Sequence, residues 1–213
     1  MEKLRSKKRF LTHNYDVICA LYGSLLGDCH AEKRYNSTRF TLQQESSNME
    51  YLMWYHSFFA DRGYMSPEKP TIKKCIGKNS KVRFYYRIRT WSFSSLNWIY
   101  DSFYPNGKKI VPKNLEDFFS PLTITIWIQE DGCVLSSGLK ISTNCFTFED
   151  VKFLCQLFKT KYSIEASPNK DGNQWIIYIP KKSMPILAEL IKDYVVPSMF
   201  YKFNNYLPIV TNK

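Results

Sequence analysis

The sequence predicts an α+β protein built from two similar halves. Segments with the hydrophobic spacing of helices alternate with segments in which apolar residues recur at every second position, and some of the latter flank polar turns as hairpins do. Two apolar segments, LYGSLLGDC at residues 21–29 and ITIWIQEDG at residues 124–132, each end on an acidic residue near a glycine and lie about half the chain apart. Similar elements follow each segment, which indicates a duplicated unit.

The first half begins after a strongly basic segment, residues 1–14, which we expect to be an N-terminal arm. Asn48 precedes an aromatic-rich helical pattern and is a suitable N-cap residue. The elements expected between residues 15 and 112 are a helix at 15–28, a strand at 39–45, a helix at 48–61, a hairpin with strands at 71–76 and 81–90 around the loop 77–80, and a helix at 94–104.

The second half, residues 113–213, repeats this order in fewer residues. Thr147 and Asp150 have the spacing of a capping box at the start of a helix. The elements expected here are a helix ending at 131, a strand at 139–144, a helix at 147–159, strands at 162–167 and 174–179 around the turn 169–172, and a helix at 184–194.

Composition narrows the class of partner. The chain has 213 residues, 44% of them hydrophobic, and a net charge of +11, which favours a polyanionic partner such as nucleic acid or an acidic membrane surface. No apolar run is long enough to span a bilayer, so we expect no membrane insertion. The six cysteines include no Cys-x-x-Cys pair and the three histidines are scattered, which argues against a zinc site and agrees with free thiols in a reducing compartment.

Polar and basic side chains share one face of three expected strands. A row of cations on a strand can follow phosphates, and a β-ribbon fits the DNA major groove, where such side chains pair with base edges. For any one strand alone, a solvated sheet face explains the pattern equally well. The residues are Arg39, Thr41 and Gln43 on the first strand, Lys81, Arg83, Tyr85, Arg87 and Arg89 on the second, and Lys140, Ser142 and Asn144 on the third.

Asp28 and Asp131 occupy matching places at the ends of the two apolar segments. The helix dipole makes a carboxylate at a helix C-terminus unfavourable by roughly 0.3–1 kcal/mol. Carbonyl groups left unpaired in the last helical turn, together with a carboxylate, form a set of oxygen ligands that suits Mg²⁺. Two such helix ends therefore predict a site with two acids and divalent metal ions.

With these motifs the chain resembles the LAGLIDADG homing endonucleases of the single-chain, two-motif type, and most of all their yeast mitochondrial intron-encoded members. The resemblance extends from about Tyr15 to Asn204. It implies a pseudo-twofold pair of αββαββα units, in which the two motif helices pack together and two saddle-shaped antiparallel sheets lie in the DNA major groove. Two motif positions depart from the family pattern, Ile126 in place of Gly or Ala and Cys29 in place of Gly, so we expect a different helix spacing.

The resemblance also implies roles for individual residues. Mg²⁺ would be bound by the two acids, with Mn²⁺ as an alternative ion, and Ca²⁺ would bind without supporting cleavage. The residues carried over are Asp28 and Asp131 as metal-binding acids, the carbonyl groups of Gly27 and Glu130 as supporting ligands, Lys109 and Lys202 as basic groups near the scissile phosphates, and Gln43 as a side chain that positions water.

The function expected is therefore Mg²⁺-dependent, site-specific cleavage of double-stranded DNA by a monomer at a long asymmetric site. Resemblance implies 3′ overhangs and an organellar location, in the mitochondrion. Two alternatives stay open. The first is an intron RNA maturase, a splicing factor that the same fold can host, and the second is a basic ribosome- or RNA-associated module, which explains the charge but not the two acids.

Overall fold

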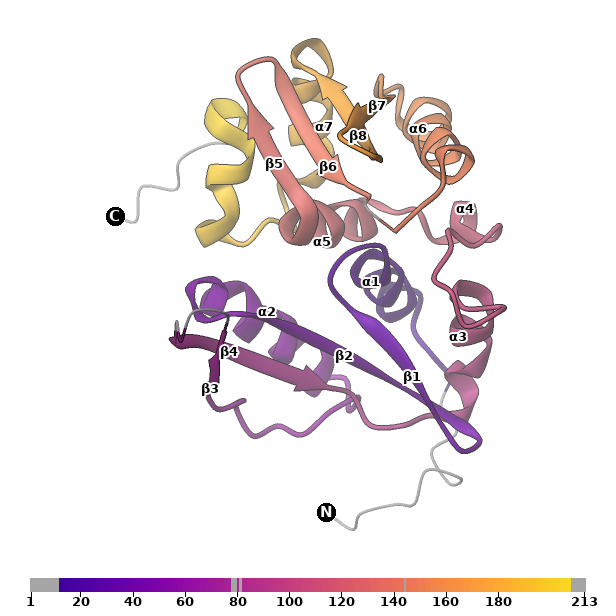
Figure 1. The fold of residues 1–213 in the computed structure, drawn as a ribbon, viewed down its shortest axis with the longest axis vertical. Helices are drawn as coiled ribbons and strands as arrows, with labels where there is room; N and C mark the ends of the chain where they lie inside the picture. Colours follow the sequence, from indigo (N-terminus) through magenta and orange to yellow (C-terminus); the bar gives the residue numbers. More distant parts are fainter. Residues whose placement is uncertain (1–11, 78–79, 81, 144, 208–213) are drawn as a thin grey trace.

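Each half of the chain folds into a four-stranded antiparallel sheet with helices packed on one face (Figure 1). The structure is a computed structural model that describes residues 12–77, 80, 82–143 and 145–207. Helices α1 (Tyr15–Leu26) and α5 (Pro121–Asp131) lie against each other at the centre, where the two halves meet (Figure 1). The predicted α+β class, duplicated unit and central helix pair are confirmed.

The first half contains one sheet and its helices. Its strands are ordered β1-β2-β4-β3, and all neighbours run antiparallel. The elements in chain order are α1, β1 (His30–Arg34), β2 (Ser37–Glu45), the short 3-10 helix η2 (Ser46–Asn48), α2 (Met49–Ala60), β3 (Lys73–Ile76), β4 (Val82–Arg89), η4 (Ser94–Leu96) and α3 (Asn97–Phe103).

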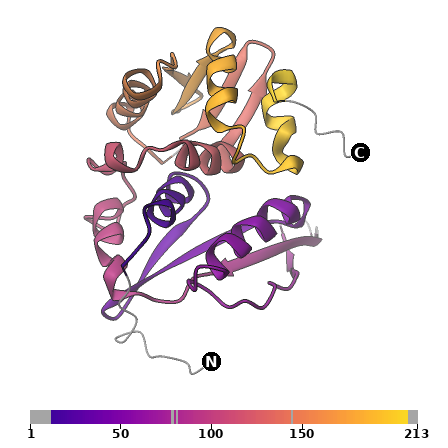
Figure 2. The same ribbon diagram turned by 180° about the vertical axis from the view of Figure 1, so that it is seen from behind.

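The second half repeats this plan with the strand order β5-β6-β8-β7. Figure 2, the view from behind, shows helices of both halves in front of the sheets. The elements are α4 (Leu115–Phe118), α5, β5 (Gly132–Leu135), β6 (Gly138–Ser142), α6 (Phe148–Tyr162), β7 (Ser167–Asp171), β8 (Gln174–Pro180), η5 (Lys181–Ser183), α7 (Met184–Ile191) and η6 (Pro197–Tyr206).

The central helices approach closely at Gly23. A methyl group built on Gly23 would come within 2.5 Å of the carbonyl oxygen of Thr123, so only glycine fits there. The Thr123 hydroxyl also donates a hydrogen bond of 3.0 Å to the carbonyl of Cys19 on α1. The close contact is thus made by glycine on α1 against backbone on α5, and Ile126 at the matching motif position of α5 is accommodated in the core.

Three expectations about the second half and the caps were wrong in detail. Of the strand expected at 162–167, Tyr162 ends α6, residues 163–166 form a connection, and only Ser167 belongs to a strand, β7. The expected turn residues Asn169 and Asp171 also lie within β7, paired with Ile176 and Gln174. The chain reverses one step later at Gly172, whose φ of +61° suits glycine. Asn48 makes no side-chain cap to α2, whereas Thr147 and Asp150 do form the predicted capping box of α6.

Two strands, β1 and β5, were not recognised from hydrophobic alternation. β1 has the sequence HAEKR, in which a single apolar residue cannot establish a period of two. It forms because its backbone pairs with β2 over five residues. In the part of the chain that the structure describes, no helix is both long and apolar enough to cross a membrane.

Candidate active site

The two acids lie at the ends of the central helices, at the junction of the halves. Asp131 is the last residue of α5, and Asp28 follows α1 by two residues. Burial, and then the nearby charge of Asp28, raises the pKa of Asp131 to about 7. Burial also raises the pKa of Asp28, although the residue is open to solvent. The fold therefore brings together two carboxyl groups that come from matching positions of the repeat.

A lysine from each half contacts the end of a central helix. Lys109 donates hydrogen bonds to the carbonyl oxygens of Gly27 at 3.0 Å and Cys29 at 3.3 Å. In the second half Lys202, carried by η6, donates to the carbonyl of Gln129 at 2.6 Å and to that of Glu130 at 3.2 Å. Burial lowers the pKa of Lys202. The carbonyls expected as supporting metal ligands, those of Gly27 and Glu130, thus accept hydrogen bonds from lysines in this structure.

The charges of the two lysines act on both acids. Lys109 and Lys202 each lower the pKa of Asp28 and of Asp131, against the larger opposing effect of burial. The ammonium groups also balance the partial negative charge that the dipole places at the helix ends. Two acids and two lysines, all singled out in the sequence, therefore form one electrostatic unit.

The glutamine that contacts Asp28 is Gln44, whereas the sequence pointed to Gln43. Gln44 Nε2 donates to Asp28 Oδ2 at 2.9 Å, and its Oε1 accepts from Asn48 Nδ2 at 2.9 Å. Gln43 lies on the opposite face of β2, is exposed, and accepts a hydrogen bond from Arg87. Because successive strand residues point to opposite faces, a difference of one position decides which glutamine reaches the acid.

The side chain of Glu130 is a member of the site that the sequence did not reveal. Its Oε1 accepts hydrogen bonds from Ser24 Oγ at 2.9 Å and Tyr51 Oη at 2.7 Å, and its Oε2 accepts one from the backbone N–H of Asp28 at 2.8 Å. Burial, and then the charge of Asp28, raises the pKa of Glu130 well above its usual range. The sequence offers one signal for this role: Glu130 precedes Asp131 at the position where the first repeat has the small residue Gly27.

The oxygen groups at the site suit a hydrated divalent cation, which needs few protein ligands. Among the described residues, the structure groups no three His, Cys, Asp or Glu side chains as a metal cage. Mg²⁺ keeps several water ligands and needs only one or two carboxylates from the protein. Two neighbouring carboxyl groups, one with a pKa near 7 because burial and like charge disfavour its anion, suit a divalent cation that would offset both effects.

The first sheet presents a basic face away from the helices. Hydrogen bonds hold several of its side chains: Arg39 donates to Glu32 at 2.6 Å, and Arg87 donates to Gln43 at 2.8 Å. Burial would raise the pKa of Glu32, but the hydrogen bonds from Arg39 and Arg34 outweigh it and lower that pKa to about 2. Arg83 and Arg89 are exposed and Tyr85 is half-buried, Thr41 is only 2% exposed and bonds to Glu32, and Lys81 lies outside the described residues.

The second sheet presents fewer free charges. Lys140, half-buried, forms an ion pair of 3.0 Å with Asp171 on β7. Its neighbours across the sheet are Cys133 on β5 and Tyr178 on β8. Ser142 is half-buried, and Asn144 lies outside the described residues. Among the described residues, the first face therefore keeps Arg87 and Arg89 without an ion pair, with Arg39 and Arg83 paired to Glu32 and Glu45, whereas Lys140 on the second face is paired.

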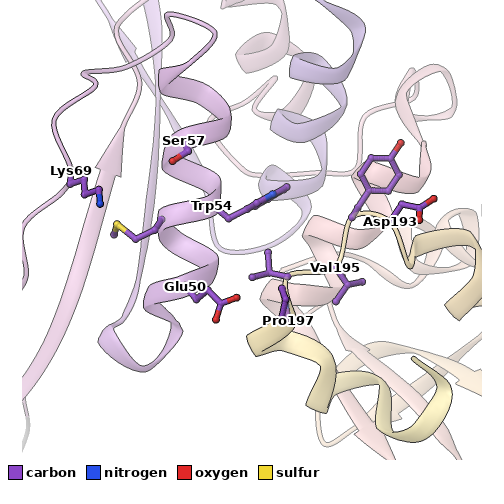
Figure 3. A pocket seen from close by; sticks show the side chains of 10 residues that line it. Glu50, Trp54, Ser57, Lys69, Asp193, Val195 and Pro197 are labelled. Carbon is purple, nitrogen blue, oxygen red and sulfur yellow. The ribbon is translucent and has the colours of Figure 1, made fainter. Parts of the chain in front are cut away.

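A separate pocket of about 510 Å³ lies between α2 and the segment that follows α7 (Figure 3). Glu50 and Trp54 line it from α2, and Asp193 and Val195 line it from the second half. Its described lining includes none of the acids, lysines or sheet residues named above. The pocket is therefore distinct from the acid centre.

Known proteins resemble this chain along most of its length. Residues 18–187 match the model of the LAGLIDADG DNA endonuclease family. The chain is 43% identical over 205 residues to Cytochrome b mRNA maturase bI2 of Saccharomyces cerevisiae, an alignment that covers 91% of this chain and 48% of the relative, so the chain spans about half the length of that relative. It is 35% identical over 157 residues to intron-encoded endonuclease ai4 of Dictyostelium discoideum, covering 69% of this chain and 96% of the relative.

The fold also matches a solved structure, the homing endonuclease I-WcaI bound to its DNA recognition sequence. The TM-score is 0.82 at 22% identity, over 93% of this chain and 90% of that one. The family match includes α1 from residue 18 onward, all of α5 and both acids, Asp28 and Asp131.

Proposed function

Because the chain belongs to the LAGLIDADG DNA endonuclease family, we propose that it is a site-specific endonuclease that hydrolyses both strands of a long, asymmetric DNA site and leaves 3′ overhangs. One observation carries the proposal. Two acids and two lysines from opposite halves meet at the ends of α1 and α5, so each strand of a duplex has one acid and one lysine available to it.

The roles of these residues follow from their chemistry. Asp28 and Asp131 would hold Mg²⁺, which lowers the pKa of bound water and neutralises charge on a phosphate. Lys109 and Lys202 would offset the charge that develops on each scissile phosphate as its bond to the leaving oxygen breaks. Their present contacts with backbone carbonyls keep both ammonium groups beside the acids. Gln44, which donates to Asp28, would fix the direction of that carboxylate.

The two sheets would read the DNA. The basic face of the first sheet, with Arg39, Arg83, Arg87 and Arg89, suits phosphates and guanine edges in a major groove. Gln43 and Thr41 belong to the same face. Gln43 would contribute to DNA binding by holding Arg87 in place, and Thr41 would do so through its hydrogen bond to Glu32. Lys140, Ser142 and Tyr178 would contact the other half of the site. Lys81 and Asn144 keep the DNA-binding role proposed from the sequence.

We also propose that the protein acts as a monomer in an organelle, the mitochondrion. A single chain already contains both acids, so one copy supplies the groups for both strands. The names of two yeast relatives refer to cytochrome b mRNA, which favours a mitochondrial gene as the source of those relatives.

A second function is favoured by one specific observation. Two yeast relatives that are 43% and 41% identical to this chain are named maturases. Binding of intron RNA to assist splicing is therefore the alternative, and the acids would be dispensable for it. The two functions make opposite predictions for variants that lack Asp28 and Asp131.

The decisive experiment is incubation of the protein with Mg²⁺ and a randomised duplex DNA library, followed by sequencing of the cut ends. Endonuclease activity predicts one long asymmetric site with 3′ overhangs. A parallel reaction with Ca²⁺ should retain the same DNA without cutting it, and Mn²⁺ should support cutting. The maturase function would be favoured instead if the wild-type protein cleaved no DNA, and if the Asp28→Asn/Asp131→Asn variant still bound intron RNA.

A further inference from the structure

Glu130 connects the second half of the molecule to the acid of the first half. It is a half-buried residue at the end of α5, and its carboxyl group points across the junction into the first half, where all three of its donors lie. Two of them are hydroxyl groups, on Ser24 of α1 and Tyr51 of α2. The third is the backbone N–H of Asp28 itself, at 2.8 Å.

Space for this carboxyl group depends on Gly27. A methyl group added to Gly27 would collide with Glu130 Oε2, the atom that accepts the hydrogen bond from Asp28. Gly27 and Glu130 occupy the same motif position in the two repeats, immediately before the acid. One repeat therefore supplies the side chain at this position and the other supplies the room for it.

The arrangement has no counterpart at the second acid. Gly27 has no side chain that could return a hydrogen bond to the backbone of Asp131. Asp28 receives support from two directions, through its backbone from Glu130 and through its carboxylate from Gln44. Within the described residues, no side-chain hydrogen bond to Asp131 matches these two contacts. The pseudo-twofold symmetry of the acids is thus broken by the groups that hold them.

We propose that the Glu130 side chain is a positioning residue for Asp28, so that the two acids, and the two DNA strands they serve, depend on it unequally. The inference rests on the proposed endonuclease function for its strand dependence, but the positioning of Asp28 can be measured without any cleavage. Displacing a catalytic group by about 1 Å can cost on the order of 100-fold in rate. Removal of Glu130 is therefore expected to slow one strand far more than the other.

The first measurement follows cleavage of each strand separately, on a duplex labelled at both ends, for the wild type and Glu130→Ala, Glu130→Gln and Tyr51→Phe. Asp28→Asn identifies the strand that depends on Asp28. Glu130→Ala should slow that strand at least about tenfold and the other less than about threefold. Glu130→Gln keeps an oxygen for the Asp28 N–H and should cleave both strands within about threefold of wild type.

Tyr51→Phe is the matched control, because it removes one hydrogen bond to Glu130 and leaves the contact with Asp28 in place. If Glu130 only joins the two halves, each of the variants Tyr51→Phe and Glu130→Ala will lower the cleavage rates of the two strands by the same factor. That result would contradict the proposal. The proposal is also wrong if Glu130→Gln slows cleavage of the Asp28-dependent strand as selectively as Glu130→Ala does, because the charge of Glu130 rather than its hydrogen bond would then matter.

The second measurement is amide hydrogen exchange of Asp28, read by NMR on the free protein. The exchange rate of the Asp28 N–H should rise at least about tenfold in Glu130→Ala and stay near the wild-type rate in Glu130→Gln. The Asp131 N–H should change little in either variant. Unchanged exchange at Asp28 in Glu130→Ala would refute the proposal even in a chain that cleaves no DNA, whereas faster exchange without cleavage would leave the positioning role intact and refute only the nuclease function.

Discussion

In the first half of the molecule Lys109 binds the carbonyl oxygens that follow α1, and in the second half Lys202 binds those at the end of α5. The sheets beside these two centres do not match in this way. The first carries Arg39, Arg83, Arg87 and Arg89 on its open face, of which Arg39 and Arg83 form ion pairs with Glu32 and Glu45, while the second carries Lys140, which is paired with Asp171.

This contrast separates two demands on a duplicated protein. Cleaving two chemically identical strands requires the same groups twice, so the acids and lysines remain paired. Reading an asymmetric sequence requires different side chains on the two sheets, because each half of the site presents different base edges. The proposed function therefore needs one acid and one lysine in each half, whatever groups hold them, and different side chains on the two sheets.

The largest effect is expected from the acids. Asp28→Asn and Asp131→Asn each remove a carboxylate proposed to bind metal, so we expect a loss of several kcal/mol in transition-state stabilisation, which corresponds to a rate decrease on the order of 1000-fold or more. Rates measured strand by strand in Mg²⁺, with DNA affinity measured in Ca²⁺, check this. Affinity should change by less than about fivefold, and full cleavage by either variant would remove that acid from the mechanism.

The lysines test whether the symmetry extends to function. Lys109→Met and Lys202→Met each remove one cation that is proposed to lie near a scissile phosphate, which should slow cleavage by roughly 100-fold. Because each lysine binds the carbonyl of the residue just before the acid of its half, Gly27 or Glu130, the two losses should agree within about fivefold. Single-turnover rates at saturating protein provide the measurement, and a loss confined to one lysine would show that the two centres work differently.

The sheets should differ where the acid centres agree. Arg87→Ala removes a cation from the first face and should weaken DNA binding by about tenfold and lower the slope of log affinity against log salt by about 1. Lys140→Ala should have a smaller effect on both quantities, because Asp171 already neutralises this lysine. Titrations at several salt concentrations measure both, and equal slopes for the two variants would contradict the proposed asymmetry.

The two acids should also differ in their response to pH. The pKa of Asp131 is raised to about 7, so its proton is retained below that pH and must leave before a metal ion binds. At low Mg²⁺, cleavage should rise roughly tenfold from pH 6 to pH 8, and higher Mg²⁺ should move the midpoint to lower pH because metal and proton compete. Profiles of cleavage rate against pH at two Mg²⁺ concentrations test this. A midpoint that does not change with Mg²⁺ concentration would show that the titrating group is not Asp131.

The smallest effects are expected from substitutions at the N-termini of the matching helices α2 and α6, which should act on different quantities. Thr147→Ala removes a capping box and should cost about 1 kcal/mol, a decrease in Tm of roughly 2–4 °C, with little effect on cleavage. Asn48→Ala removes no cap but frees Gln44, the side chain that holds Asp28, so it should slow cleavage by about threefold with little change in Tm. Calorimetry and strand-specific rates on both variants measure the difference, and the reverse result would contradict this assignment.

The sequence alone was sufficient to predict features whose residues all lie within one short segment. The two acids stand out because each ends an apolar segment with helical spacing, where a carboxylate is unfavourable. In the structure Asp131 is the last residue of α5, and Asp28 follows α1 by two residues. The capping box of α6 is complete within four residues, and the confirmed α+β duplication appears as a repeated order of elements. The family similarity rests on the same two motifs and is confirmed by matches that extend over most of the chain.

The tertiary structure decided the contacts that join distant segments. Gln44 rather than Gln43 reaches Asp28 because the pairing of β2 sets which face each residue occupies, and a shift of one residue reverses it. The turn residues Asn169 and Asp171 became part of β7 because pairing with β8 outweighed their local preference. Glu130 holds Asp28 only because α1 and α5 pack closely enough for a side chain of one half to enter the space beside Gly27, and no pattern within either segment contains that distance.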